Sequence, residues 1–204
     1  MLDYIQNNWL EWFGVLTGLL YIFLEIRQRT SMWVIGFFSS FVFVIVFFKS
    51  KLYADMVLNI YYVTMSVYGF WLWKKNGNEA EPIDRKDEIT YQNLGLWLGA
   101  ILLLISTVLY LGIASVLHHY TDSPVPYSDA FPTALSLIAT WLLAKKYLEQ
   151  WLVWIVVNVF SIGLFTYRGL YPTAFLFLVY GILSVVGYLK WKADYKPIMT
   201  NVNE

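Results

Sequence analysis

Two tryptophans and an asparagine between positions 151 and 158 have the types and spacing of a binding surface. Trp151, Trp154 and Asn158 occupy positions i, i+3 and i+7, so all three lie on one face of a helix. That face offers aromatic rings and an amide that donates and accepts hydrogen bonds. Asn158 lies roughly 10 Å along the helix axis from Trp151, deep in an apolar segment. An amide at that depth needs partners, which either a substrate or a neighbouring helix can supply.

The other candidates are neutral polar side chains in further apolar segments. Asn59, Tyr62 and Ser66 repeat the i, i+3, i+7 spacing, and Tyr180 corresponds to Tyr62 in a later segment. Trp151 also lies near the end of its segment, where tryptophan commonly anchors a helix at the lipid interface, so that alternative stays open. The candidate substrate-binding residues are Trp151, Trp154, Asn158, Asn59, Tyr62, Tyr180, Thr140 and Ser40.

The charged and reactive side chains argue against catalysis and against ion coupling. Glu25, Asp55 and Asp129 lie near the ends of their apolar segments. Carriers coupled to protons or sodium usually need an acidic or histidine relay at depth, so we expect uncoupled, facilitated diffusion. The chain has no cysteine, and His118 and His119 adjoin each other in a predicted loop. Without a nucleophile, metal cluster or carboxylate pair at one depth, and with zero net charge, we expect no enzyme, no metal, no cofactor and no nucleic-acid partner.

The elements that position these side chains are predicted to be membrane-spanning helices. With 59% hydrophobic and 14% charged residues among 204, the chain has too little polar surface to cover a soluble globule. A helix needs roughly 20 apolar residues to cross a bilayer, and backbone groups in lipid must be bonded within the segment. We therefore predict an all-α membrane protein with seven transmembrane helices, near residues 9–26, 33–48, 55–73, 93–117, 127–144, 149–167 and 171–190.

The chain also repeats itself. A shift of 118 residues lays Phe13–Trp73 over Phe131–Trp191 without a gap, and 13 of the 61 positions are identical. One helix separates these three-helix units, so both cross the membrane in the same direction, and a parallel 3+1+3 arrangement is typical of transporters. The predicted divisions are a first repeat at 1–74, a charged loop, linking helix and outer loop at 75–126, a second repeat at 127–192 and a cytoplasmic tail at 193–204.

Basic residues predict the orientation, and differences between the repeats predict the ligand's place. Eleven Lys and Arg residues fall on one side of the predicted membrane and three on the other, which puts the amino terminus outside and the carboxyl terminus in the cytoplasm.

When the repeats are aligned, Trp154 corresponds to Gly36 and Asn158 to Ser40. An asymmetric ligand near a pseudo-two-fold axis requires such a break in symmetry, so we expect the ligand there.

At these residues the chain resembles the Pnu family of bacterial vitamin transporters, whose members carry nicotinamide riboside, thiamine or, in some cases, riboflavin. The resemblance rests on AKKYLEQWLVWIVVN at 144–158, LYAD at 52–55 and YGFWLW at 68–73. It implies a bacterial inner-membrane protein with a fold like that of the SWEET sugar carriers, a homotrimer, and facilitated uptake with the vitamin trapped by a cytoplasmic kinase. It also implies substrate contacts from Trp151, Trp154 and Asn158, joined by Asn59, Tyr62 and Tyr180.

The resemblance narrows the ligand further. Nicotinamide riboside and thiamine both present a flat cationic ring, on which aromatic faces can stack with a cation–π attraction of ~1 to 2 kcal/mol when desolvated. The chain lacks the extra leading helix of some nicotinamide riboside carriers and has Asn59 where glutamine is common, so we prefer thiamine, with nicotinamide riboside as the alternative and the larger riboflavin disfavoured. A different class, the substrate-binding membrane module of an ATP-driven vitamin importer, also fits these features.

Overall fold

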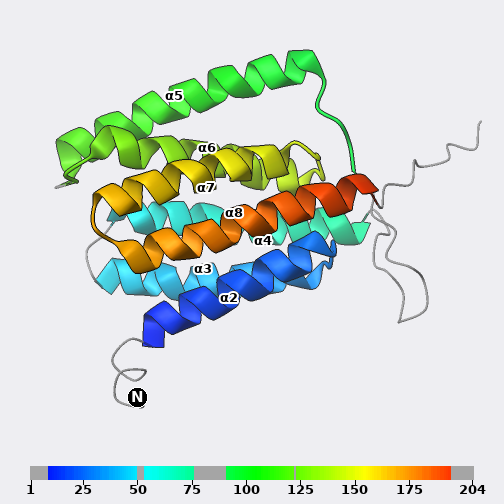
Figure 1. Ribbon diagram of the computed structural model, residues 1–204, viewed down its shortest axis with the longest axis horizontal. Helices are drawn as coiled ribbons and strands as arrows, with labels where there is room; N and C mark the ends of the chain where they lie inside the picture. Colours follow the sequence, from blue (N-terminus) through cyan, green and yellow to red (C-terminus); the bar gives the residue numbers. More distant parts are fainter. Residues whose placement is uncertain (1–8, 50–52, 76–90, 122, 194–204) are drawn as a thin grey trace, which may run out of the picture.

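The computed structural model describes residues 9–49, 53–75, 91–121 and 123–193, and these ranges form a helical bundle (Figure 1). Each helix coincides with one of the predicted apolar segments to within a few residues. Within the described ranges there is no strand, only an isolated bridge between Gln92 and Tyr147. Most of the predicted charged loop and the cytoplasmic tail lie outside the described residues. The helices are α2 (Trp9–Ile26), α3 (Ser31–Lys49), α4 (Tyr53–Lys75), α5 (Leu96–Tyr120), α6 (Pro126–Ala144), α7 (Gln150–Tyr167) and α8 (Tyr171–Ala193).

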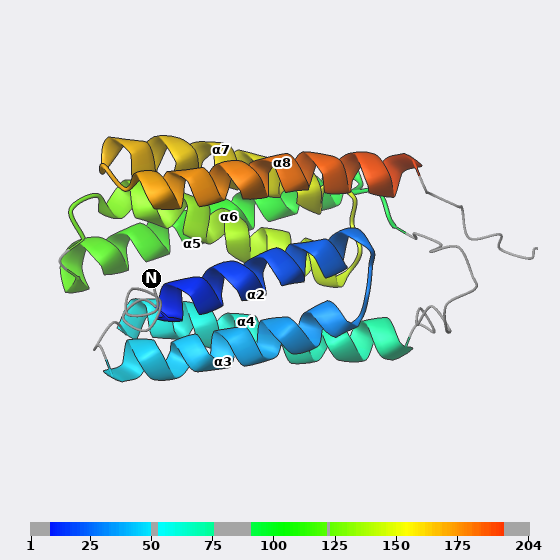
Figure 2. The ribbon, with the colours of Figure 1, turned by 60° about the horizontal axis from the view of Figure 1, so that its bottom comes forward.

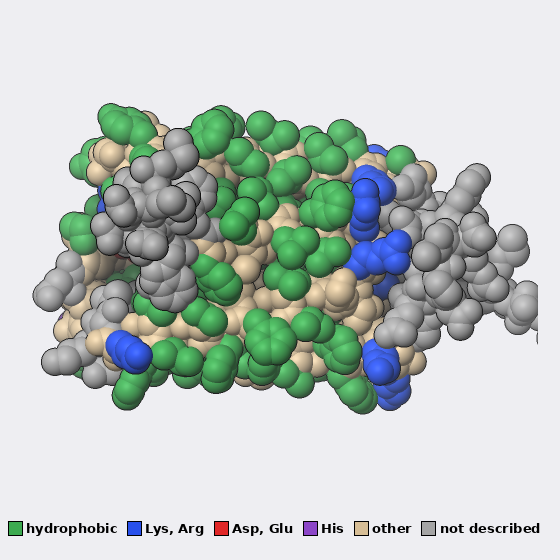
Figure 3. Space-filling model, turned by 90° about the horizontal axis from the view of Figure 1, so that it is seen from below, with side chains coloured by type: hydrophobic (Ala, Val, Ile, Leu, Met, Phe, Trp, Pro, Cys, Tyr) green, Lys and Arg blue, Asp and Glu red, His purple; other side chains and the backbone are tan. Residues whose placement is uncertain are grey.

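Four helices, α3, α5, α7 and α8, are long and apolar enough to cross a membrane, and α2 contains a shorter apolar stretch, Phe13–Ile26. Phenylalanines on α3 and leucines on α5 point outward, and Phe38 and Leu103 are 61% and 69% exposed. On the face seen in Figure 3, hydrophobic side chains are spread over the described surface between the two ends of the bundle. An apolar surface of this extent is typical of contact with lipid. The chain is therefore a multi-pass membrane protein.

The helices form two three-helix units that lie one above the other (Figure 2). The first unit contains α2, α3 and α4, the second contains α6, α7 and α8, and α5 packs on α6. Helices α2, α4, α6 and α8 run in one direction and α3, α5 and α7 in the other (Figure 1). The units meet where α2 packs on α8 and where α4 packs on α6.

Basic side chains mark one end of the bundle, which we call the basic end (Figure 3). Among the described residues, Lys49 and Arg168 lie at the opposite end, and the other Lys and Arg residues lie at the basic end. They are Arg27, Arg29, Lys74, Lys75, Lys145, Lys146, Lys190 and Lys192.

The core at the basic end is built from two tryptophan pairs. Trp33 meets Trp73 edge-on, with ring centroids 5.7 Å apart at 89°, and Trp151 meets Trp191 at 5.5 Å and 89°. All four side chains are almost fully buried. The Trp33 ring lies directly on Gly69, and the Trp151 ring lies on Gly187 in the same way. The two units therefore repeat this packing at positions that differ by 118 residues.

The same tryptophans join the units to each other. The indole Nε1 of Trp73 donates a hydrogen bond to the Ala144 carbonyl (3.0 Å), and Trp191 Nε1 donates to the Ile26 carbonyl (3.2 Å). Ala144 and Ile26 end the first helices of their units and again differ by 118 positions. The third helix of each unit thus holds the end of the first helix of the other unit.

A polar contact between the two connecting loops adds to these bonds. Lys146 Nζ donates a hydrogen bond to Gln28 Oε1 (3.2 Å), and the two residues also correspond by the 118-residue shift. Both have a left-handed backbone, with φ of 49° at Gln28 and 58° at Lys146. Burial lowers the pKa of Lys146 to about 8. The loops therefore follow one conformation in both units and meet each other at the basic end.

Candidate functional site

Asn158 lies inside the second unit, where α7 faces α8. Its side chain is 3% exposed, and its Nδ2 donates a hydrogen bond to Ser184 Oγ (3.2 Å). Ser184 Oγ in turn donates to the Tyr180 carbonyl (2.8 Å). Gly181 packs beside Asn158, since a Cβ there would lie in ordinary van der Waals contact, 3.5 Å from Asn158 Cβ. One donor of the amide therefore joins two helices, which is the helix-to-helix alternative that the sequence left open.

The two candidate tryptophans of α7 lie in different surroundings. Trp151 is fully buried between Gly187 and Trp191, so a ligand could reach its ring only if α7 and α8 moved apart. Trp154 is half-buried, and its indole Nε1 is enclosed without a hydrogen-bond partner. Trp151 Nε1 also lacks a hydrogen-bond partner, so Trp154 is the better placed of the two because its ring is less buried.

Tyr62 and Thr140 meet between α4 and α6. The Tyr62 side chain is hydrogen-bonded to Ser136, and Thr140 Oγ1 donates to the Ser136 carbonyl (2.8 Å). The neighbouring Tyr61 hydroxyl donates to the Leu137 carbonyl (2.7 Å). These hydroxyl groups line the contact between the first and second units rather than the interior of either unit.

Tyr180 occupies the mirrored place between α8 and α2. Its hydroxyl lies against Gly18, where a Cβ would collide with it. Gly18 and Ser136 correspond by the 118-residue shift, as do Tyr180 and Tyr62. The structure thus gathers the candidates into two groups, Asn158 with Tyr180 and Tyr62 with Thr140. Ser40 on α3 and Asn59 on α4 are both half-buried, and we assign them to neither group.

Three further residues belong to this region and were missed by the sequence reasoning. Glu25 and Gln150 are 4% and 0% exposed, although Glu25 had been placed at a predicted helix boundary. Tyr21, one turn before Glu25, interacts electrostatically with both Glu25 and Tyr62. The signal that could have found Glu25 and Gln150 is the repeat itself, because their counterparts are the apolar residues Leu143 and Met32.

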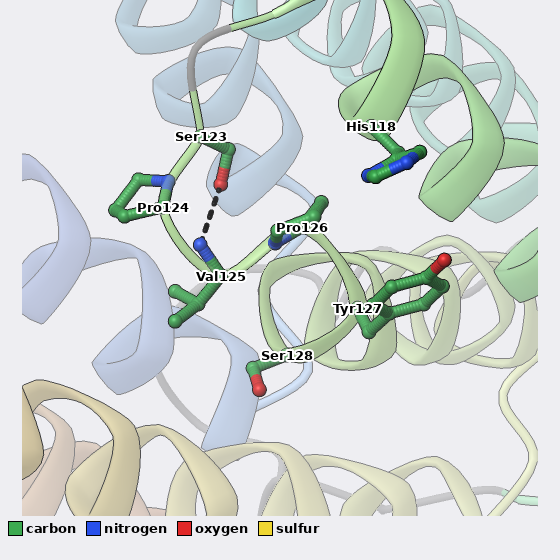
Figure 4. Close-up of a pocket in the computed structure, with 7 residues that line it drawn as sticks. All are labelled: His118, Ser123, Pro124, Val125, Pro126, Tyr127 and Ser128. Carbon is green, nitrogen blue, oxygen red and sulfur yellow. Dashed lines mark hydrogen bonds between the residues drawn. The ribbon is translucent and has the colours of Figure 1, made fainter.

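A hollow of about 540 Å³ lies elsewhere, at the end of the bundle opposite the buried tryptophans (Figure 4). There Ser123 Oγ accepts a hydrogen bond from the Val125 amide (3.3 Å) and donates one to Asp129 Oδ2 (2.7 Å). The hollow is open and belongs to the loop before α6, and none of the candidate residues lines it. Its lining residues are His118, Ser123, Pro124, Val125, Pro126, Tyr127 and Ser128.

Comparison with known families decides what kind of protein carries this arrangement. The family described as nicotinamide mononucleotide transporter matches residues 8–193, which is nearly all of the chain. The chain belongs to this family. The Pnu-type resemblance seen in the sequence is therefore confirmed, and the family is one of membrane transporters rather than enzymes.

Individual relatives agree with this assignment. The nicotinamide riboside transporter PnuC of Escherichia coli K12 is 26% identical over 203 residues, covering 90% of this chain and 85% of the relative. PnuC of Neisseria mucosa is 28% identical, covering 91% and 72%. The riboflavin/roseoflavin transporter RibM of Streptomyces davaonensis is 22% identical, covering 94% and 90%.

A solved structure shares the fold. The crystal structure of the vitamin B3 transporter PnuC matches with a TM-score of 0.73 and 26% identity, covering 94% of this chain and 84% of that one. The predicted all-helical membrane fold is thus supported from sequence and from structure.

Proposed function

We propose that this protein carries nicotinamide riboside across the bacterial cytoplasmic membrane. The observation that carries the proposal is the match along about nine-tenths of the chain to relatives named nicotinamide riboside transporters. These relatives favour the alternative of the sequence analysis over its preference for thiamine. Riboflavin stays the weaker candidate, although RibM shows that more distant relatives carry a three-ring vitamin.

The proposed architecture is seven transmembrane helices in two parallel repeats, similar to the SWEET carriers, with divisions at 1–74, 75–126, 127–192 and 193–204. The mirrored tryptophan pairs and loop contacts support the repeats. The concentration of Lys and Arg at the basic end supports a cytoplasmic location for that end, with the amino terminus outside.

The proposed substrate site extends from the interior of the second unit to the contacts between the two units. Trp154 supplies a ring face and a free indole donor, and Asn158 supplies the amide atoms that Ser184 does not use. Tyr62, Thr140 and Tyr180 supply hydroxyl groups from both contacts between the units, with Asn59 further along α4 and Ser40 on α3. In this proposal Trp151 supports the site from behind, because its ring is packed on Gly187.

Transport follows if the two units rock against each other. The bonds from Trp73 to Ala144 and from Trp191 to Ile26 close the basic end, so release to the cytoplasm requires both to break. Each such bond contributes about 1 kcal/mol net, which thermal motion can overcome. We propose facilitated diffusion by a homotrimer, with the vitamin trapped inside by a cytoplasmic kinase.

Uptake by purified protein in liposomes tests this function. Nicotinamide riboside, thiamine and riboflavin are offered in parallel at equal concentration, without any ATPase component. We expect nicotinamide riboside to enter fastest. We also expect added riboflavin to slow its uptake less than added thiamine does. Faster thiamine uptake would restore the earlier preference. Binding without uptake, followed by uptake once ATPase subunits are added, would favour the importer-module alternative.

A further inference from the structure

Glu25 is a buried acid at the basic end that forms no ion pair within the described ranges. Its side chain is 4% exposed, and its Oε1 has no hydrogen-bond partner. Gln150 is the polar side chain beside it, yet neither amide atom of Gln150 has a partner at hydrogen-bonding geometry. Within the described ranges the recorded ion pair, Arg168 with Asp129, lies at the opposite end of the bundle. A buried carboxylate left unpaired is costly, so such a group usually serves a ligand or a function.

The basic side chain of the adjoining loop is engaged elsewhere. Lys146 Nζ donates to Gln28 and lies 4.5 Å from the centroid of the Trp73 ring. Its charge is therefore directed at that pair of groups rather than at Glu25.

The position of Glu25 connects it to the proposed substrate site. Tyr21 lies one turn earlier on the same face of α2 and interacts electrostatically with Glu25 and with Tyr62. Tyr62 is hydrogen-bonded to Ser136 on α6. On its other side, Gln150 directly precedes Trp151 at the start of α7. The carboxyl group thus lies between Tyr21 on α2 and Gln150 on α7, and Tyr21 connects it to Tyr62.

The repeat shows that this polar pair is not needed for the scaffold. At the mirrored place the chain has Leu143 and Met32, which are 1% and 0% exposed. A leucine and a methionine fill the equivalent space there without any hydrogen bond. The surrounding tryptophan packing is otherwise the same in both units. The presence of Glu25 and Gln150 in place of the apolar pair therefore has a cause other than folding.

We propose that Glu25, assisted by Gln150, is the counter-charge that selects a positively charged aromatic ring over a neutral one as the ligand passes towards the basic end. This inference rests on the proposed function and adds the charge of the substrate to it. The rings of Tyr21 and Tyr62 flank the route, so a flat cation can meet a carboxylate and aromatic faces together.

Two forms of one ligand test the inference. Nicotinamide riboside carries a pyridinium charge, whereas its reduced dihydro form is neutral and keeps the amide and the ribose. In Glu25→Gln, we expect the Kd for the oxidised form to rise about tenfold or more, because a buried charge loses its partner. The Kd for the reduced form should change by less than about threefold. Asp129→Asn is the control, since it removes an acid at the opposite end of the bundle, and it should leave both values unchanged.

The outcomes separate this inference from the proposed function. The role of Glu25 would be overturned if Glu25→Gln weakened the binding of both forms equally, or of neither. Binding by the wild-type protein would still support the transporter in that case. Failure of the wild-type protein to bind either form would instead count against the proposed function. If Glu25→Gln does not fold, Gln150→Met, which copies the mirrored residue, should still weaken the oxidised form selectively, and unselective loss there would also overturn it. Proton-driven uptake in the wild type that Glu25→Gln abolishes would assign the carboxylate to proton transfer instead.

Discussion

Each unit combines an aromatic ring with a small residue, and the ring is Tyr21 in the first unit and Trp154 in the second. The two rings come from different helices of their units. In the first unit the ring of Tyr21 on α2 fills the space beside Gly36. A Cβ at position 36 would lie 2.9 Å from that ring. In the second unit the counterparts are Ala139, which is fully buried, and Trp154 on α7. Each unit therefore pairs one large with one small residue, but the ring comes from the first helix in one unit and from the second helix in the other. This exchange breaks the symmetry between the two units at these positions.

Replacing Trp154 by alanine should weaken nicotinamide riboside binding by about tenfold or more, because a stacking face is lost. Trp97 on α5 is 80% exposed, so Trp97→Ala removes the same side chain away from the unit contacts and should leave the Kd unchanged. Binding by calorimetry on the detergent-solubilised protein measures both. Equal losses in the two variants would remove Trp154 from the proposed site.

Asn158 raises a separate question, since its amide already bonds Ser184. Ser184→Ala removes that bond and the bond within α8 from Ser184 to the Tyr180 carbonyl. It should lower stability by ~0.6 kcal/mol for the bond between the helices, with the Kd nearly unchanged. Asn158→Ala should show the same stability loss and weaken binding about tenfold besides. Melting temperature and Kd, measured on both variants, distinguish the two roles. If both variants bind equally well, the amide serves only to join α7 and α8.

Sequence reasoning reached these residues unevenly. The spacing of Trp154 and Asn158 placed them correctly on one face of α7, because helical periodicity is a local property. It could not tell that Trp151 is covered by Gly187, since that contact depends on how closely α7 and α8 approach. Glu25 was missed for the same reason: hydropathy marks the end of a helix, but whether that end is covered depends on Gln150, far away in the sequence.

At the scale of the helices, glycine decides how closely the second and third helices of each unit approach. Gly69 on α4 and Gly187 on α8 are close-packing points, and each touches the tryptophan ring of the neighbouring helix. The boundaries of the helices followed from apolar segment length alone. The contacts that join α4 to α6 and α8 to α2 did not, because they run between the units and leave no periodic trace in the sequence.

Gly187→Ala and Gly69→Ala should each lower the melting temperature and separate the tryptophan pair, because a Cβ at either position would overlap the indole ring. Gly112 on α5 has open space around it, so Gly112→Ala is the matched control. That control should be neutral or stabilising by up to ~1 kcal/mol, the usual gain from alanine over glycine in a helix. A melting temperature of Gly187→Ala equal to that of Gly112→Ala would show that α7 and α8 can accommodate the methyl group.

For the whole molecule, composition and the 118-residue repeat were enough to predict an all-helical membrane protein with two similar three-helix units. The substrate was not predictable to the same degree. Nicotinamide riboside and thiamine present the same kind of flat cation, and the residue types that bind one also bind the other. The preference for thiamine rested on single features such as Asn59, and similarity along the whole chain outweighs them.

The charge of the proposed substrate makes a prediction about transport by the intact protein. A carrier that moves a single cation without a coupled ion transfers one net charge per cycle, so the membrane potential acts on it directly. A potential of about −100 mV inside contributes ~2.3 kcal/mol per charge, or about 50-fold accumulation. In liposomes we expect a potassium diffusion potential to drive nicotinamide riboside inward to about this extent, whereas a pH or sodium gradient at zero potential should have no effect. The neutral reduced form serves as the control and should only equilibrate under all three conditions. Accumulation of the reduced form in a pH or sodium gradient would contradict facilitated diffusion.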